Sequence, residues 1–259
     1  MGNPRPEQVY REVMVVEPPR VTSPLQEMER DFLFGEVWPR PGLSRRERRM
    51  VTLACVWAAD APKPIEDHVY AALASGDLSL MQIQELMLQF AVYCGWPKAS
   101  NAEGVLRVQW ARWMKEQGAE PTRWPDLDNE TLGVNDWEAR LSRGEQEFWD
   151  VNYVPPPARD TPYNHAGILN FVFGHVWLRP GLTRRERRII TIACVGIDDA
   201  PMPLNSHIGS ALESGDLSVE EMNEIILQFA AYYGFAKAEA MQSAAQRSWE
   251  RIAAARASR

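Results

Sequence analysis

Cysteine and histidine are scarce in this 259-residue chain, which holds three Cys and four His. The three cysteines, Cys55, Cys94 and Cys194, form no CxxC pair and no Cys/His cluster. We therefore expect neither a disulfide framework nor a zinc site, and the sequence predicts no metal. We interpret the cysteines as small buried apolar residues.

The chain also lacks a basic excess and a long apolar run. Lys and Arg number 28 against 35 Asp and Glu, a net charge of −7, whereas nucleic-acid-binding proteins are usually basic. No apolar run approaches the roughly 18 residues that a membrane span needs. The segment 1–20 is rich in Pro and charge and lacks the apolar centre of a signal peptide. We expect a cytoplasmic protein that binds neither nucleic acid nor membrane.

An internal repeat dominates what is present. Residues 32–99 align without a gap on residues 171–238, at a spacing of 139, with 39 of 68 positions identical. A period of this length indicates a duplicated domain and not a stacking repeat unit. We place the first domain at residues 1–118, a linker at 119–135 and the second domain at 136–259.

The pattern of each copy is helical throughout. Ser44-Arg45-Arg46-Glu47 and Thr183-Arg184-Arg185-Glu186 are capping boxes, each followed by an apolar run. Ser79 and Ser218 are placed to cap a later helix, whose apolar residues recur every three or four positions. No alternating strand pattern is visible, so we predict an all-α fold of two tandem helical domains.

A distinctive set of polar, aromatic and small residues recurs in both copies. In the first copy these are Phe34, Gly35, Val37, Trp38, Arg40, Pro41, Gly42, Leu43, Arg48, Ala54, His68, Ala72, Leu73, Gly76, Glu85, Tyr93 and Gly95. The second copy repeats each of them 139 positions later. In this set each copy resembles the carboxymuconolactone decarboxylase family, over two segments of nearly 70 residues.

The resemblance implies an all-helical, cofactor-independent protein that assembles into a ring. Single-domain decarboxylases of the family are hexamers, so a tandem chain is expected to form a homotrimer with a pseudo-sixfold ring. Peroxidase relatives use a CxxCxxxH motif, and alanine and proline replace both cysteines in both copies (Ala61, Pro64, Ala200 and Pro203). Peroxidase chemistry through a thiol is therefore not expected.

His68 and His207 are the histidines at equivalent places in the two copies. An imidazole can pass a proton to a carbanion or enolate near neutral pH, whereas the alternative is a core histidine bonded to a backbone carbonyl. The family motif places its histidine here, which favours catalysis. Glu47 and Glu186 are further catalytic candidates that would orient the histidine or act as a base, although the capping box also explains both.

Several other matched residues are candidates for substrate binding. Arg40 and Arg179 would hold a carboxylate through two hydrogen bonds, or else pack as surface residues over the neighbouring tryptophan. Trp38 and Trp177 would supply an apolar wall. A polar stripe lies on one helix of each copy and either faces the site or, as we prefer, bonds a neighbouring helix; it comprises Glu85, Gln89 and Tyr93, and Glu224, Gln228 and Tyr232. Of these, the two tyrosines are kept as site candidates.

The copies differ at a few positions that could line a pocket. Trp57 and Tyr70 are matched by glycines, Glu36 by a histidine, and Glu66-Asp67 by Asn205-Ser206; the replacing residues are Gly196, Gly209 and His175. We predict that the two sites are not equivalent and that the roomier one belongs to the second copy, with His207 and His175.

The resemblance predicts a cofactor-independent lyase that decarboxylates a carboxylated lactone or keto acid. Such a substrate carries its own electron sink, so histidine proton transfer and fixed charge would suffice. The family activity removes carbon dioxide from γ-carboxymuconolactone in aromatic-acid breakdown. The alternatives are a diverged isomerase, hydratase or cyclase on a related small molecule, or a non-enzymatic ligand-binding or assembly protein.

Overall fold

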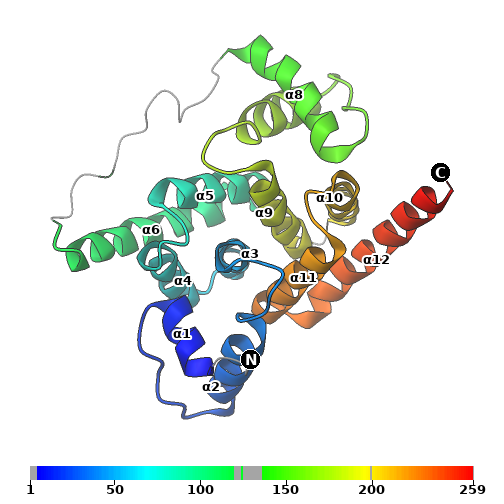
Figure 1. Ribbon diagram of the computed structural model, residues 1–259. Coiled ribbons are helices and arrows are strands. Elements are labelled where there is room, and N and C mark those ends of the chain that lie inside the picture. The colour runs from blue at the N-terminus through cyan, green and yellow to red at the C-terminus, as the bar shows by residue number, and fades with distance from the viewer. Residues whose placement is uncertain (1–4, 120–123, 125–135, 199, 259) are drawn as a thin grey trace.

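The computed structural model describes residues 5–119, 124, 136–198 and 200–258. Every regular element in these ranges is a helix, which confirms the predicted all-α fold (Figure 1). The predicted linker lies outside the described residues except for Ala119 and Trp124.

The helices follow the order of the repeat. The first copy comprises α1 (Pro6–Met14), α2 (Pro24–Met28), η1 (Glu29–Val37), α3 (Arg45–Ala59), α4 (Pro62–Ala74), α5 (Leu80–Cys94) and α6 (Trp96–Glu116). The second comprises α8 (Trp137–Asn152), η2 (Tyr163–Val176), α9 (Arg184–Ile197), α10 (Pro201–Ser214), α11 (Val219–Tyr233) and α12 (Phe235–Ala257).

The predicted caps set the helix starts. The Ser44 and Thr183 side chains accept from the backbone of Glu47 and Glu186, and each glutamate bonds back to the cap residue. Both capping boxes therefore satisfy amide groups that the first helical turn leaves without a partner. Ser79 and Ser218 cap α5 and α11 in the same way.

The helices η1 and η2 have the wider π-helical turn, which the sequence pattern did not distinguish from an α-helix. The backbone N–H of Trp38 donates to Leu33, five residues earlier, and that of Trp177 donates to Val172. Such turns are often found at functional sites, because they change the direction of the next side chain. Here each π-helix ends immediately before a candidate site tryptophan.

The two copies are interleaved around α3 and α9, which pack on each other at the centre of the molecule (Figure 1). Helix α5 of the first copy packs on α9 of the second, and α11 of the second packs on α3 of the first. A single apolar core runs through both copies and includes buried residues such as Leu53, Phe90, Ile192 and Phe229. The duplicated domains thus share one core.

The contacts between the copies are reciprocal. Arg46 pairs with Glu186 at 2.7 Å, and Arg185 pairs with Glu47 at 2.9 Å. Two buried hydrogen bonds repeat the relation, from Gln89 to Thr191 and from Gln228 to Thr52, each at 3.0 Å. Contacts in which i meets j and j meets i are those of a twofold axis, so the copies form a pseudo-twofold pair.

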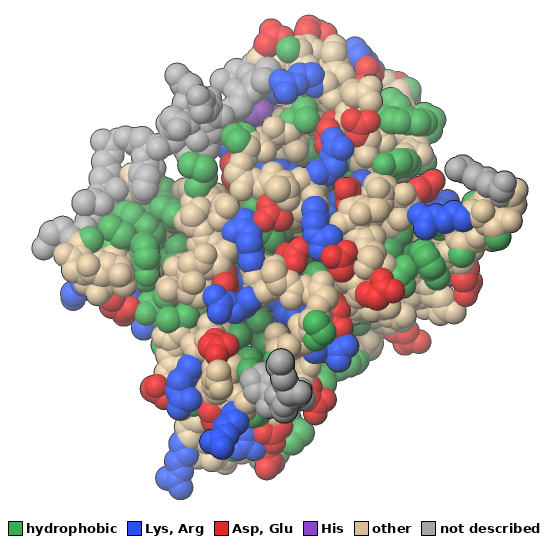
Figure 2. Space-filling view, viewed as in Figure 1, with side chains coloured by type: hydrophobic (Ala, Val, Ile, Leu, Met, Phe, Trp, Pro, Cys, Tyr) green, Lys and Arg blue, Asp and Glu red, His purple; other side chains and the backbone are tan. Residues whose placement is uncertain are grey.

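The outer surface mixes both signs of charge. Figure 2 shows basic and acidic side chains interspersed across the middle of one face, with apolar side chains gathered at its left edge. None of the described helices is long and apolar enough to span a membrane.

Candidate active site

The first candidate site brings together side chains from four elements. His68 comes from α4, Arg49 from α3, and Trp38 from the end of η1, whereas Tyr232 comes from α11 of the other copy. The interleaving of the copies is what brings this tyrosine to the histidine. Each site is therefore built from both halves of the chain.

Arg49 is the buried centre of this site. Its Nη1 lies 3.2 Å from Nδ1 of His68, and its Nη2 lies 3.2 Å from an Asp77 carboxylate oxygen and donates to the backbone carbonyl of Val13. The side chain is fully buried, so the Asp77 carboxylate compensates a charge that would otherwise be costly to bury. Asp77 and α1 together fix the guanidinium against the histidine.

These contacts define the protonation of His68. Burial, reinforced by Arg49, lowers the pKa of His68 well below its usual value, so the ring is neutral near pH 7. A guanidinium can only donate, so Nδ1 must accept and the ring hydrogen must lie on Nε2. The first site therefore presents a neutral imidazole with an Nε2–H donor.

Two aromatic side chains enclose the His68 ring. Trp38 stacks on it with ring centres 6.4 Å apart, and Tyr232 meets it edge-on at 5.1 Å. The Trp38 indole donates to the Tyr232 hydroxyl at 2.8 Å. Burial raises the pKa of Tyr232, so its hydroxyl keeps its proton and can donate it in a hydrogen bond.

An open cleft of about 660 Å³ reaches this site. His68 and Tyr232 line it together with residues of α1, α2, η1 and α3, most of them apolar, such as Met14, Leu33 and Val56. Its charged side chains are Glu29, Lys63 and Asp67, of which the last two pair with each other. An apolar cleft ending at polar donors is the usual form of a small-molecule site.

The second copy builds the same constellation in reverse. Trp177 stacks on His207 at 6.0 Å, Tyr93 of the first copy meets His207 edge-on at 5.6 Å, and the Trp177 indole donates to the Tyr93 hydroxyl at 3.0 Å. Arg188 takes the place of Arg49 and pairs with Asp216. Burial lowers the pKa of His207 to about 3, helped by Arg188.

The second site differs in its hydrogen bonds. His207 Nδ1 and Arg188 Nη2 are buried without a hydrogen-bond partner in the part of the chain that is described. Arg188 Nη1 donates instead to Ser210 at 3.0 Å, where the first copy has Ala71. The two sites thus differ in the hydrogen bonds of their buried guanidinium groups.

The predicted substrate-binding arginines lie in the interface between the copies. Arg40 bonds both carboxylate oxygens of Glu224, and Arg179 bonds both of Glu85, with shortest distances of 2.7 and 2.6 Å. The same glutamates also pair with Arg48 of α3 and Arg187 of α9, so this part of the polar stripe bonds a neighbouring helix, whereas its tyrosines face the histidines. A substrate contact for either arginine stays a prediction.

Glu47 and Glu186, the other predicted catalytic residues, also have structural partners. Each closes its capping box with one oxygen and pairs across the interface with the other. Within the described residues, no hydrogen bond joins either carboxylate to His68 or His207. Their catalytic role stays a prediction.

The two glycines of the second copy that replace large residues of the first, Gly196 and Gly209, lie in different surroundings. Gly196 lies in the core, where Met241 fills the space that Trp57 fills in the first copy. Gly209 does line a pocket, of about 380 Å³, which is smaller than the cleft beside His68 and is not lined by His207 or His175. His175 stacks on Phe171 at 6.4 Å. The larger of these two cavities belongs to the first copy, and the relative room beside His207 stays a prediction.

Arg49 and Arg188 were not among the predicted site residues. Both belong to the RRERR segments, where charge alone does not separate a buried arginine from its exposed neighbours. The available signal was position, because each directly precedes the apolar run of its helix and each is repeated in both copies. Asp77 and Asp216, their partners, are repeated as well.

The helical fold, the duplication and the paired histidine sites define a class of protein, and a family comparison agrees. The model of the carboxymuconolactone decarboxylase family matches residues 24–107 and 162–247. These two segments cover more than half of the chain, so it belongs to this family as a tandem-domain member.

Two curated relatives carry decarboxylase names. Nitrosuccinic acid decarboxylase npaB from Metarhizium robertsii is 36% identical over 81 residues, 31% of this chain and 56% of that protein. The 4-carboxymuconolactone decarboxylase from Acinetobacter baylyi is 39% identical over 71 residues, 27% of this chain and 52% of that protein. The chain thus spans about half the length of each relative that it matches.

Proposed function

We propose that this protein is a cofactor-independent decarboxylase of a small carboxylated substrate, and that the His68 cleft is its working site. The observation that carries the proposal is the buried Arg49–His68 pair at the end of an open apolar cleft. The decarboxylase names of two relatives support the reaction class.

The substrate class follows from the chemistry that these side chains supply. Loss of carbon dioxide leaves an electron pair, which the substrate must accept on its own conjugated carbonyl, lactone or nitro group. The negative charge that develops there meets the Nε2–H of His68 and the hydroxyl of Tyr232. Fixed donors in a water-poor site stabilise such a charge more than water does.

The proton balance runs through His68. The bond to the carboxyl carbon breaks, its electron pair forms the enolate, and the enolate carbon takes the proton of Nε2. A neutral imidazole acts as an electrophile toward a carbonyl oxygen, and in this proposal the same Nε2–H is also the acid toward carbon. Arg49 at Nδ1 stabilises the negative charge left on the ring until a proton from solvent restores it through the cleft.

The test measures carbon dioxide release from 4-carboxymuconolactone and from nitrosuccinic acid, with wild type, His68→Ala and His207→Ala. We expect release from one of these substrates and a loss of about 10²–10⁴-fold in His68→Ala, the range for a lost proton-transfer group. His207→Ala is the matched control and should keep activity within a few-fold of wild type.

Two results would contradict the proposal. If folded wild type releases no carbon dioxide from either compound, both are excluded as substrates. An isomerase, a hydratase or a binding protein is then favoured. Equal losses in both histidine variants would contradict the assignment to the first copy.

We also propose that three chains assemble into a homotrimer. The reciprocal contacts within one chain are those of a twofold axis, whereas neighbours in a simple sixfold ring meet head to tail. The expected assembly is therefore three pseudo-twofold pairs around a threefold axis, a revision of the pseudo-sixfold ring. Light scattering should give three times the 29.5 kDa chain mass, and a monomer would exclude the trimer.

A further inference from the structure

A polar pocket lies between α10, α12 and the C-terminal end of α8, and it shares no lining residue with the cleft beside His68. Its volume is about 380 Å³. The residues that line it include Asn205, Gly209, Ser210, Glu213, Arg247 and Arg251. Most of these side chains are polar, in contrast to the apolar cleft at the first site.

The pocket exists because Gly209 replaces an aromatic residue. In the first copy Tyr70 occupies this position, with the Arg112 guanidinium 3.9 Å from its ring centre and its hydroxyl 2.5 Å from Glu116. Arg251 is the counterpart of Arg112, and without the tyrosine ring its guanidinium lines the open pocket.

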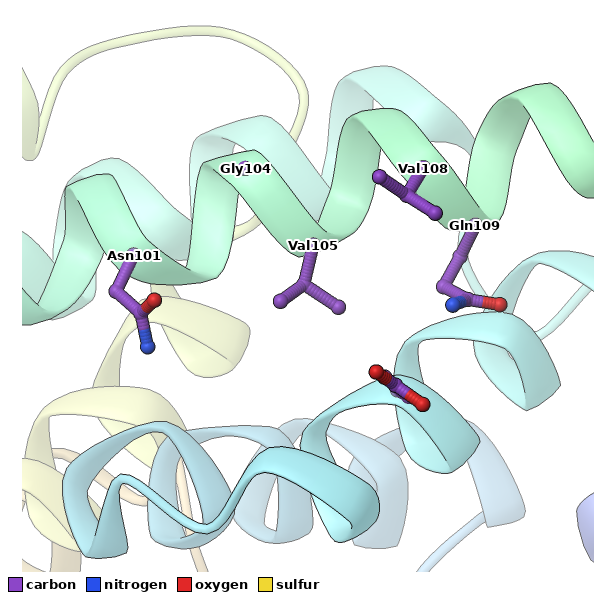
Figure 3. A pocket seen from close by; sticks show the side chains of 6 residues that line it. Asn101, Gly104, Val105, Val108 and Gln109 are labelled. Atoms are coloured by element: carbon purple, nitrogen blue, oxygen red, sulfur yellow. The ribbon is translucent and has the colours of Figure 1, made fainter.

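The corresponding groove of the first copy has a different surface. It is lined by Glu66 of α4 and by residues of α6, and Figure 3 shows Asn101, Val105 and Gln109 pointing from α6 toward the helix below it. In the second copy Asn205 replaces Glu66, and Arg247 replaces the aliphatic Val108.

These replacements reverse the charge of the surface. At the positions that line the second-copy pocket, the first copy carries two carboxylates, Glu66 and Asp67, and one guanidinium. The second copy carries two guanidiniums, Arg247 and Arg251, and one carboxylate. These positions are therefore acidic in the first copy and basic in the second.

The guanidiniums keep donors for a ligand. Arg247 donates to Asn205 at 3.1 Å, and Arg251 has only a long contact of 3.9 Å with Glu213, so most of their N–H groups are unengaged by the described residues. The pocket wall also holds hydroxyls, among them Ser210, which accepts from buried Arg188 and so lies one hydrogen bond from the second histidine site.

We propose that this pocket binds a small hydroxycarboxylate anion. The two arginines match the geometry of a carboxylate, which guanidinium groups bind through paired hydrogen bonds. The serine, asparagine and glutamate side chains match hydroxyl groups, because they offer both donors and acceptors. About half of the lining surface is polar and about half is apolar, which suits a small anion with a short carbon chain.

The experiment follows the melting temperature and the calorimetric affinity of the full chain with L-malate, at constant ionic strength. Succinate lacks the hydroxyl and glycerol lacks the charge, so both should bind more weakly than malate. We expect Arg247→Val, which restores the first-copy residue on an exposed position, to weaken malate binding about tenfold or more.

A second variant tests the space and not the charge. Gly209→Tyr restores the first-copy ring and should abolish malate binding, with Arg251 moving over the ring as Arg112 does. Gly209→Ala is its milder companion, because a Cβ there meets the mobile ends of Arg251 and Ser248 at 3.3 Å. Circular dichroism and the unliganded melting temperature verify that each variant is folded.

His68→Ala separates this pocket from the cleft. Malate binding that persists in His68→Ala and is lost in Arg247→Val supports the pocket. Binding that is lost in His68→Ala and kept in Arg247→Val would place malate in the cleft and overturn the proposal. So would an absence of binding up to about 50 mM malate, a concentration that reveals even weak ligands.

Discussion

At the scale of single residues, the two motif histidines have different hydrogen bonds although they occupy equivalent positions in the repeat. His68 accepts from Arg49 at 3.2 Å, whereas Nδ1 of His207 has no partner within the described residues. A buried nitrogen without a partner costs free energy that a satisfied one does not. The second histidine is therefore the less stabilised of the two.

The pH dependence of stability should report the burial of His207. Its pKa is about 3 in the folded chain and about 6.5 when unfolded, so between these values the unfolded chain binds more protons. Stability is then present above pH 6.5 and is lost as the pH falls toward 3. Relative to His207→Gln, wild type should lose about 2 kcal/mol in free energy of unfolding between pH 7 and 5.

Urea unfolding at several pH values makes this measurement. The difference between wild type and His207→Gln cancels the carboxylates and His68, which titrate in both proteins. A difference that stays constant from pH 7 to 5 would show that His207 is not buried as a neutral ring.

The sequence predicted part of the candidate site and could not predict the rest. His68 and Trp38 could be found because the repeat retains them and the family motif includes them. Charge alone did not separate Arg49 from its neighbours, since burial of one guanidinium in a charged segment depends on a distant partner, Asp77. Tyr232 lies at the first site because the two copies are interleaved, and no local sequence pattern encodes that arrangement.

At the scale of elements, the copies differ in which helix of an equivalent pair carries the larger core residue. In the second copy Gly196 of α9 faces Met241 of α12, and the equivalent positions of the first copy hold Trp57 of α3 and Ala102 of α6, both in the core. Both arrangements fill the core. A large residue on one helix requires a small one on its neighbour, because protein interiors are close-packed.

This exchange predicts a change of sign between two backgrounds. A Cβ at Gly196 would lie 2.6 Å from the Met241 sulfur, so Gly196→Ala should destabilise wild type by about 1–3 kcal/mol through overpacking. In a Met241→Ala background the clash is gone, and the higher helix propensity of alanine should make the same change stabilising by up to about 1 kcal/mol. Denaturant unfolding of the four proteins tests this, and a destabilisation of equal size in both backgrounds would contradict it.

Helix starts were predictable from local residues, and helix packing was not. The serine and threonine caps at positions 44, 79, 183 and 218 act within four residues, so the sequence shows them directly. The wide turns of η1 and η2, and the exchange of α5 and α11 between the copies, depend on contacts that are distant in sequence. The burial of Gly196 against Met241 depends on such a distant contact as well.

At the scale of the whole molecule, buried ion pairs join the two copies. Glu85 forms ion pairs with Arg179 and Arg187, whose side chains are 7% and 0% exposed. Glu224 serves Arg48, which is 0% exposed, and Arg40, which is 47% exposed. The two glutamates occupy equivalent positions in the repeat, but only Glu85 compensates two buried guanidiniums.

Removal of one carboxylate should therefore have unequal effects. Glu85→Gln takes the counter-charge from two buried guanidiniums and should cost about 3–5 kcal/mol, the range for breaking a buried pair. Glu224→Gln should cost less, because water can solvate the exposed guanidinium once the carboxylate is lost. Glu103→Gln, in a pair that is nearly half exposed on both sides, is the control and should change stability by under about 1 kcal/mol. Equal losses for the two interface glutamates in urea unfolding would mean that the copies are joined with the same strength on both sides of the pseudo-twofold axis.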